Sequence, residues 1–79
     1  MKTSDCYLMY VRWSDEDAAY VGYCPDLFPA GGVCHATSKI EAYSRLTEIV
    51  EDLVTTAEQQ GMALPPCLTR PMREVELSL

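Results

Sequence analysis

The sequence predicts a small α+β domain, in which an antiparallel sheet of three to four strands is covered on one face by one long amphipathic helix. Three observations predict this fold class. Residues 6–24 have the composition of a β-hairpin, residues 38–60 have the apolar spacing of a helix, and polar or proline-containing turns separate these segments. The expected order of elements is therefore β-β-β-α-β, in one layer of strands and one helix.

The first two predicted strands form a hairpin. Residues 6–13 are rich in aromatic and β-branched side chains, and residues 18–24 form the returning strand. Between them, residues 14–17 read Ser-Asp-Glu-Asp, a polar turn of hairpin length. Pro25 ends the second strand, because proline has no amide hydrogen to donate.

A loop and a third strand lead to the helix. Residues 27–32 predict a loop that contains the flexible pair Gly31-Gly32, and residues 33–37 predict a short strand. A fourth strand is predicted at residues 74–77, after the turn Leu64-Pro65-Pro66. We expect a single domain over residues 1–79, since the chain is too short for two.

The helix has clear signals at both ends. Ser38 and Glu41 have the spacing of a capping box, in which each side chain accepts from the other residue's amide. Gly61 can adopt the left-handed conformation that ends a helix. Apolar residues recur at steps of three and four between these ends, which predicts one buried face. The members of this predicted stripe are Ile40, Tyr43, Leu46, Val50, Leu53, Val54 and Ala57.

The charge disfavours nucleic acid as a direct partner. The chain has twelve acidic and six basic residues, a formal net charge of −6, and its bases form no cluster in the sequence. Such a surface repels phosphate backbones and suits a basic protein, although acidity can also serve solubility alone. No apolar run approaches the roughly 20 residues of a membrane span. No apolar segment follows the N-terminus, so we expect a cytoplasmic protein without membrane contact.

The cysteines predict no metal site. Cys6, Cys24, Cys34 and Cys67 contain no C-x-x-C pair. We expect them to be reduced, with the first three packed in strands as small apolar side chains. His35 does not join Cys34 in a site, because neighbours on a strand point to opposite faces. We expect neither a metal nor a cofactor.

The second face of the predicted sheet is also apolar, although one helix covers only one face. A solvated face of an antiparallel sheet normally carries polar side chains. The second face is therefore expected to be covered by another copy, in a homodimer or higher homo-oligomer, or by a different protein. Alternatively, its tyrosines and alanines tolerate exposure. The residues predicted to lie in the contact between copies are Leu8, Tyr10 and Tyr20.

The order of these motifs over residues 6–67 resembles the HicB-like antitoxin family. That family's pattern is a tyrosine-containing strand, an acidic hairpin turn, a strand ending in Pro-Asp-Leu, a third strand, a Thr/Ser-x-x-Glu-Ala helix start and a Leu-Pro-x-Pro turn. The corresponding segments here are residues 7–13, 14–17, 20–24 with Pro25-Asp26-Leu27, 33–36, 38–42 and 64–66. The chain departs from the pattern after Leu27, where Phe28-Pro29-Ala30-Gly31-Gly32 replaces Pro-Gly-Cys, and at Ala36, Ile40 and Cys67.

The resemblance implies a partial ribonuclease H-like fold and a non-catalytic role. Such domains neutralise a small basic RNA-cleaving toxin by covering its surface. Members often carry a C-terminal DNA-binding domain, for which the twelve residues after Cys67 are expected to be too few. Alternatively, the acids are a solvated turn and Phe28 packs against the end of the helix. The candidate contacts for a basic partner are Asp15, Glu16, Asp17, Asp26, Leu27 and Phe28.

No enzyme activity is expected. Two-metal nuclease chemistry needs carboxylates that converge from neighbouring strands and a helix. The predicted strands carry no inward carboxylate, and most helical acids fall outside the apolar stripe. A Cys-His nucleophile has only His35 available, with no orienting acid at a recognisable position. The alternative function is a stand-alone homo-oligomeric domain of this fold with no toxin partner and an unknown ligand.

Overall fold

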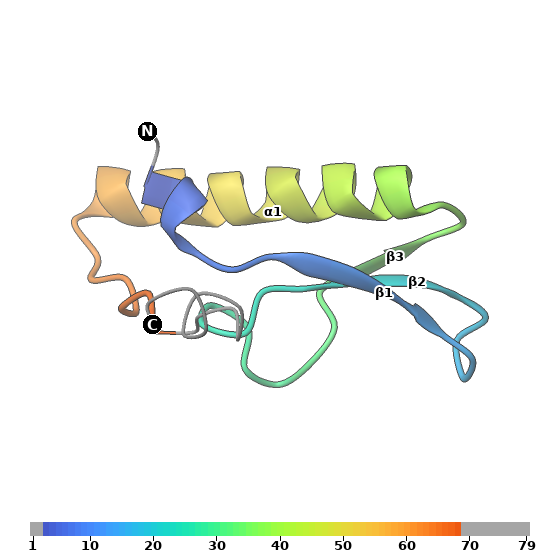
Figure 1. Cartoon of the computed structure of the whole chain (residues 1–79). Helices are drawn as coiled ribbons and strands as arrows, with labels where there is room; N and C mark the ends of the chain where they lie inside the picture. The colour runs from blue at the N-terminus through green and yellow to red at the C-terminus, as the bar shows by residue number, and fades with distance from the viewer. Residues whose placement is uncertain (1–2, 69–79) are drawn as a thin grey trace, which may run out of the picture.

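A computed structural model describes residues 3–68 of the chain (Figure 1). The fold is α+β: a three-stranded antiparallel sheet packs against one long helix. The predicted fourth strand at residues 74–77 lies outside the described residues. Within residues 3–68, no helix combines the length and apolar character needed to cross a bilayer. The elements are a 3-10 helix η1 (Thr3–Cys6), strands β1 (Tyr10–Ser14), β2 (Ala19–Tyr23) and β3 (Cys34–Ala36), and helix α1 (Lys39–Gln60).

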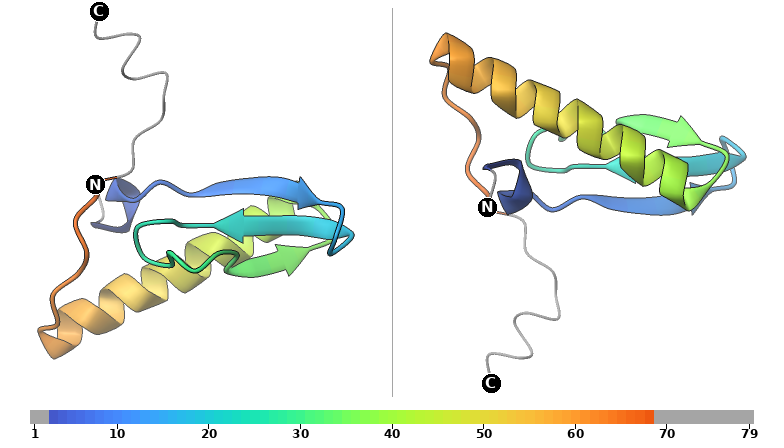
Figure 2. Two further views of the ribbon diagram at one scale, coloured as in Figure 1. Left: turned by 90° about the horizontal axis from the view of Figure 1, so that it is seen from below. Right: turned by 90° about the horizontal axis from the view of Figure 1, so that it is seen from above.

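The sheet has the order β1-β2-β3, so β2 is central and the other two strands are edges. Val11 lies opposite Gly22, which in turn lies opposite Cys34. Because paired residues share a face, these three and their neighbours two positions away point toward α1. Figure 1 shows α1 above the sheet, and Figure 2 shows that it crosses the strands diagonally.

Both predicted ends of α1 are confirmed. The Glu41 amide donates to Ser38 Oγ over 3.1 Å, so Ser38 is the N-cap. Gly61 has φ 68° and ψ 25°, the left-handed conformation, and the Met62 amide donates to the Ala57 carbonyl as in a Schellman motif. The Glu41 carboxylate, however, binds Arg45 Nη2 at 2.7 Å instead of completing a capping box.

The start of the predicted apolar stripe is wrong. Ile40 is 85% exposed and Tyr43 is 46% exposed, because the first turns of α1 pass over the free edge of β1. Leu53 is half-buried. The buried residues of α1 are Ala42, Leu46, Val50, Val54 and Ala57.

The prediction for residues 6–9 is also wrong. The strand begins at Tyr10, and Cys6 is an exposed residue of η1 rather than a buried strand residue. Tyr7, one residue later, is 5% exposed and belongs to the core, with Cys24, Leu46, Val50 and Val54. The Tyr7 ring thus enters the core from the segment between η1 and β1 rather than from a strand.

The chain itself covers part of the face opposite α1. The loop between β2 and β3 folds beneath the sheet (Figure 1). Val21 is 4% exposed there, and a Cβ built on Gly32 would come within 2.6 Å of Val21 Cγ1. On the same face, Tyr10 and Tyr23 stack with ring centroids 5.0 Å apart. This face therefore needs less cover from another molecule than the sequence suggests.

Candidate protein-binding site

An apolar groove lies between the edge strand β1 and the first turns of α1. It has a volume of about 470 Å³, and its exposed lining is almost entirely apolar. Ile40 and Tyr43 contribute the exposed apolar side chains from the helix. The residues that line the groove are Val11, Lys39, Ile40, Tyr43 and Ser44.

The pairing of β1 explains why this groove is open. β1 is hydrogen-bonded to β2 on one side only, within the part of the chain that the structure describes. Val11 points toward α1 because it lies opposite Gly22. An edge strand presents unpaired amides and carbonyls to any further strand. The groove therefore offers both an apolar surface and a strand edge.

Trp13 extends the apolar surface toward the hairpin turn. Its ring packs edge-to-face on Tyr20, with centroids 5.1 Å apart and planes at 70°, yet it remains 47% exposed. Trp13 Nε1 donates to Asp15 Oδ1 over 2.7 Å. An exposed indole held in one orientation loses little side-chain entropy on binding, as is typical of binding hot spots.

The acidic turn lies at the same end of the molecule as the groove (Figure 1). Asp15, Glu16 and Asp17 are exposed. Asp17 is held by Ser14, whose Oγ donates to the carboxylate and accepts from the Asp17 amide. Ala18 closes the turn with φ 51°, a left-handed conformation that is rare for alanine. We name this end of the molecule the hairpin-end surface, composed of Val11, Trp13, Ile40, Tyr43, Asp15, Glu16 and Asp17.

The other predicted partner contacts lie at the opposite end of β2. The five residues of β2 separate Asp17 from the turn that contains Asp26, Leu27 and Phe28. Leu27 and Phe28 are half-buried against the core, and Asp26 Oδ2 accepts from the Leu68 amide over 3.1 Å. The structure thus separates the two predicted sets, and it gives Asp26, Leu27 and Phe28 contacts within the fold.

The three residues predicted for contact between copies do not share a surface. Tyr10 lies opposite Tyr23 on the face away from α1, whereas Tyr20 lies opposite Trp13 and points toward α1. Leu8 precedes β1 and is half-buried. Alternation along one strand predicts which side chains of that strand share a face. The pairing register between strands decides which tyrosines of different strands are neighbours, and alternation alone does not give it.

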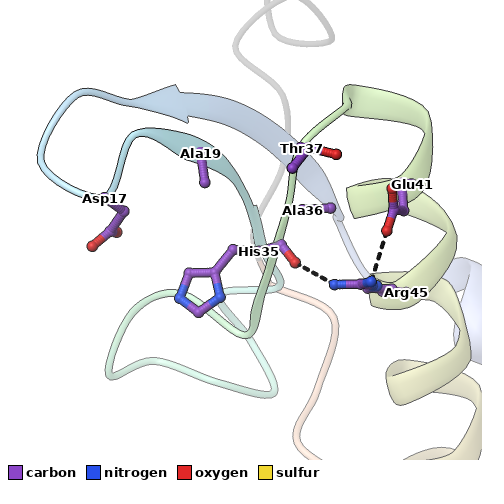
Figure 3. A pocket seen from close by; sticks show the side chains of 7 residues that line it. All are labelled: Asp17, Ala19, His35, Ala36, Thr37, Glu41 and Arg45. Carbon is purple, nitrogen blue, oxygen red and sulfur yellow. Dashed lines mark hydrogen bonds and ion pairs between the residues drawn. The ribbon is translucent and has the colours of Figure 1, made fainter.

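A second depression, of about 370 Å³, lies beside β3 and contains the charged residues shown in Figure 3. Arg45 Nη1 donates to the His35 carbonyl over 2.7 Å, while its Nη2 binds Glu41. The His35 ring points away from this pair, as does the carboxylate of Asp17. Arg45 thus covers part of the β3 edge. Among residues 3–68, no three His, Cys, Asp or Glu side chains are grouped so as to hold a metal ion.

The helical part of the hairpin-end surface was missed because Ile40 and Tyr43 were assigned to the buried stripe. The helix itself carries the corrective signal. Ala42, Leu46, Val50 and Val54 repeat at steps of four, whereas Ile40 lies six residues before Leu46, about 120° away around the helix axis. A narrower stripe centred on Leu46 would have placed Ile40 outside the core.

The hairpin-end surface is an apolar groove with a free strand edge along one side and an acidic turn at the same end of the molecule. Each of these features is suited to contact with another polypeptide. Comparison with protein-family models, with curated proteins and with solved structures found no match for this chain.

Proposed function

We propose that this chain is a non-catalytic protein-binding domain that acts as a HicB-type antitoxin and neutralises a small basic RNA-cleaving toxin. The proposal includes a cytoplasmic location, where thiols are kept reduced. The observation that carries it is the hairpin-end surface, where exposed apolar side chains lie at the same end of the molecule as the three carboxylates of the hairpin turn. The order of sequence motifs over residues 6–67 supports the same family.

The apolar part of this surface provides the centre of the proposed interface. Ile40, Tyr43 and Trp13 are 85%, 46% and 47% exposed, so a partner that covers them removes apolar area from water. Aromatic side chains at the centre of an interface contribute most of its binding energy. Ile40 and Tyr43 lie three residues apart on α1, so they present one continuous strip.

The acidic part provides orientation toward a basic partner. Asp15, Glu16 and Asp17 are exposed on one turn, and the whole chain carries a net charge of −6. Complementary charge accelerates encounter and suppresses wrong partners more than it adds affinity. The acids are therefore expected to govern the association rate and its salt dependence, whereas the apolar groove governs dissociation.

The free edge of β1 favours a second candidate, a stand-alone homo-oligomeric domain without a toxin. Two copies could pair through β1, because a strand with neighbours on one side accepts another strand. In that case Ile40 and Tyr43 would be covered by the second copy. The two candidates differ in oligomeric state and in the requirement for a basic protein.

The proposal predicts that a small basic protein is encoded beside this chain's reading frame, and the test uses that protein. That protein is expressed with the full chain, and its binding and its cleavage of RNA are measured with and without the chain. We expect a tight complex that abolishes cleavage. Ile40→Ser and Tyr43→Ala are each expected to weaken binding at least about tenfold. Ile49→Ser is the matched control, since Ile49 is 36% exposed but lies about half a turn around α1 from Ile40.

The outcomes separate the candidates. A neighbouring protein that leaves RNA intact, or cleavage that continues in the presence of the chain, contradicts the antitoxin proposal. Equal weakening by Ile49→Ser contradicts the hairpin-end surface as the interface. Sedimentation of the isolated chain tests the second candidate: a concentration-dependent dimer that Ile40→Ser dissociates supports it, and a monomer at all concentrations removes it.

A further inference from the structure

Trp13 has a fixed orientation and a carboxylate at the edge of its ring. The indole Nε1 donates to Asp15 Oδ1 over 2.7 Å, and both side chains are exposed. The Tyr20 ring packs against the indole with centroids 5.1 Å apart and planes at 70°. Two contacts, one from the hairpin turn and one from β2, therefore hold a half-exposed aromatic ring in place.

The pairing of β1 decides which side of the indole is open to a ligand. Trp13 is on the edge strand and lies opposite Tyr20, which is on the central strand β2. Within residues 3–68, β1 is paired only with β2. Tyr20 thus supports the indole from the inside of the sheet, and the exposed part of the ring lies toward the free edge, where another polypeptide has access.

This combination of groups suits a planar cation. An aromatic face attracts a cation through its quadrupole, and tryptophan does so most strongly among the aromatic residues. The carboxylate that accepts from Nε1 polarises the indole N–H and places negative charge at the edge of the ring. A carboxylate accepts several hydrogen bonds, so Asp15 can accept from a bound cation while it still holds Trp13. Two attractive groups therefore act on a cation that sits over the ring.

We propose that Trp13 and Asp15 form a recognition site for an arginine side chain of the basic partner. The guanidinium stacks on the exposed part of the indole and donates to the Asp15 carboxylate. Arginine suits the site better than lysine, because the guanidinium is flat, stacks on aromatic rings and holds its donors in a rigid plane. The identity of the partner rests on the proposed function, whereas the affinity of the site for a guanidinium does not.

The other exposed aromatic rings lack this combination. Tyr10 stacks on Tyr23 with planes 15° apart, so one face of each ring is already covered. Tyr43 is 46% exposed, but the charged residue that lines the groove with it is Lys39, a cation that repels a guanidinium. Trp13 is therefore the described aromatic residue that is best suited to bind a cation.

The base next to Trp13 in the sequence is on the wrong face to occupy the site. Arg12 lies opposite Val21, so its side chain is on the face of the sheet away from α1, whereas Trp13 is on the face toward α1. Arg45 is bound to Glu41 and to the His35 carbonyl. These two arginines therefore leave the site to a guanidinium from another molecule.

The experiment uses the fluorescence of Trp13, which is the chain's single tryptophan and so reports on this site alone. The full chain is titrated with acetyl-triarginine amide and, separately, with acetyl-trilysine amide, which carries the same charge. We expect the arginine peptide to change the indole emission saturably and to bind at least about threefold more tightly than the lysine peptide. High salt should weaken both peptides, because the carboxylates of the turn are exposed, while the preference for arginine persists.

Two substitutions that remove the same charge separate this site from the general acidity of the turn. Asp15→Asn keeps an oxygen that can accept from Nε1 but removes the negative charge, and it should weaken the arginine peptide about threefold. Glu16→Gln is the matched control, since it removes a carboxylate from the next position of the same turn, and it should weaken binding less. Circular dichroism establishes that both variants are folded.

Three results overturn the inference. They are equal affinity for the two peptides, an arginine peptide that binds weakly or not at all without changing the indole emission, and equal weakening by Asp15→Asn and Glu16→Gln. The first two are read on the unaltered chain. A basic partner that binds tightly while the arginine peptide fails contradicts this inference alone, whereas an arginine peptide that binds as expected while no neighbouring protein binds contradicts only the proposed function.

Discussion

Gly22 in β2 lies directly beneath Leu46 in α1. A Cβ at Gly22 would be 3.2 Å from both Cβ and Cδ2 of Leu46, and 3.0 Å from Cys34 Sγ. These distances are shorter than ordinary van der Waals contacts. The helix therefore approaches the sheet this closely because position 22 has no side chain, and the fully buried Leu46 fills the space.

This contact predicts the effect of Gly22→Ala. The added methyl group must displace Leu46 or Cys34, which should lower the free energy of unfolding by about 1–3 kcal/mol. Urea denaturation measures the loss. The double variant Gly22→Ala with Cys34→Ala should recover part of the lost stability, since it lacks Cys34 Sγ, the atom nearest to the added methyl group. An unchanged midpoint in the single variant would show that the helix shifts freely on the sheet.

The helix cap predicts that Ser38→Ala costs about 1 kcal/mol, because the Glu41 amide loses its acceptor. Ser38→Gly should cost only a few tenths of that, as glycine is tolerated at this position. Ser44→Ala, at an exposed helical position, is the control and should be neutral or slightly stabilising. Thermal denaturation compares the three, and equal stability of Ser38→Ala and the parent would contradict the cap.

The backbone conformation of Ala18 in the hairpin turn predicts a substitution that stabilises the fold. Ala18 adopts φ 51°, where glycine carries no steric penalty. Ala18→Gly should therefore raise the free energy of unfolding by about 0.5–1 kcal/mol, after the larger backbone entropy of glycine in the unfolded chain is offset. Ala30→Gly is the control, since φ at Ala30 is not positive. Ala30→Gly should be slightly less stable than the parent. An equal loss of stability in Ala18→Gly would contradict the steric strain at Ala18.

The packing of Phe28 predicts a contribution to folding stability rather than to partner binding. Its side chain packs against the core and is half-buried, so Phe28→Ala should cost about 2 kcal/mol of folding free energy. Leu68→Ala provides the control because that side chain is 73% exposed. Affinity for the basic partner should not change once the folded fraction is taken into account. A weaker complex with normal stability would return Phe28 to the interface.

Stability is expected to fall at alkaline pH. Burial raises the pKa of Tyr7 and of Cys24, and the hydrogen bond with Cys6 raises that of Cys67 to about 11. An ordinary thiol titrates near 9.0. Between these values the folded state retains protons that the unfolded state releases, so the stabilisation is complete below about pH 9 and is lost as the pH rises toward 11.

The measurement is the melting temperature of the reduced chain across this range. Cys67→Ser removes one of the three groups and should show a shallower decline than the parent. A melting temperature that stays constant, or rises, from pH 9 to 11 would contradict the assigned environments.

The helix could be predicted almost to the residue because its boundaries depend on local chemistry. The Ser38 hydroxyl and the conformational freedom of Gly61 act within one helical turn of the chain. The hairpin turn was also predicted, since its polar residues are contiguous. The beginning of β1 was not, because Tyr7 is drawn into a core whose other members lie far along the chain.

The candidate binding surface depended on the fold in a different way. Asp15, Glu16 and Asp17 were predicted as partner contacts from their charge and their place in a turn. The groove that Val11, Ile40 and Tyr43 form at the same end of the molecule required the diagonal crossing of α1 over β1, which no local pattern specifies. Likewise, Tyr10 and Tyr20 were predicted to share one contact surface, but the pairing register places them on opposite faces of the sheet.

The amino-acid sequence by itself determined the α+β class, the ends of the helix and the acidity of the hairpin turn, because each follows from interactions among near neighbours. Tertiary structure alone decided which apolar side chains stay exposed, how the loop covers Val21, and that the Tyr7 hydroxyl meets the Pro65 carbonyl. These outcomes depend on packing between segments distant along the chain, where small changes in register or helix angle exchange buried and exposed positions.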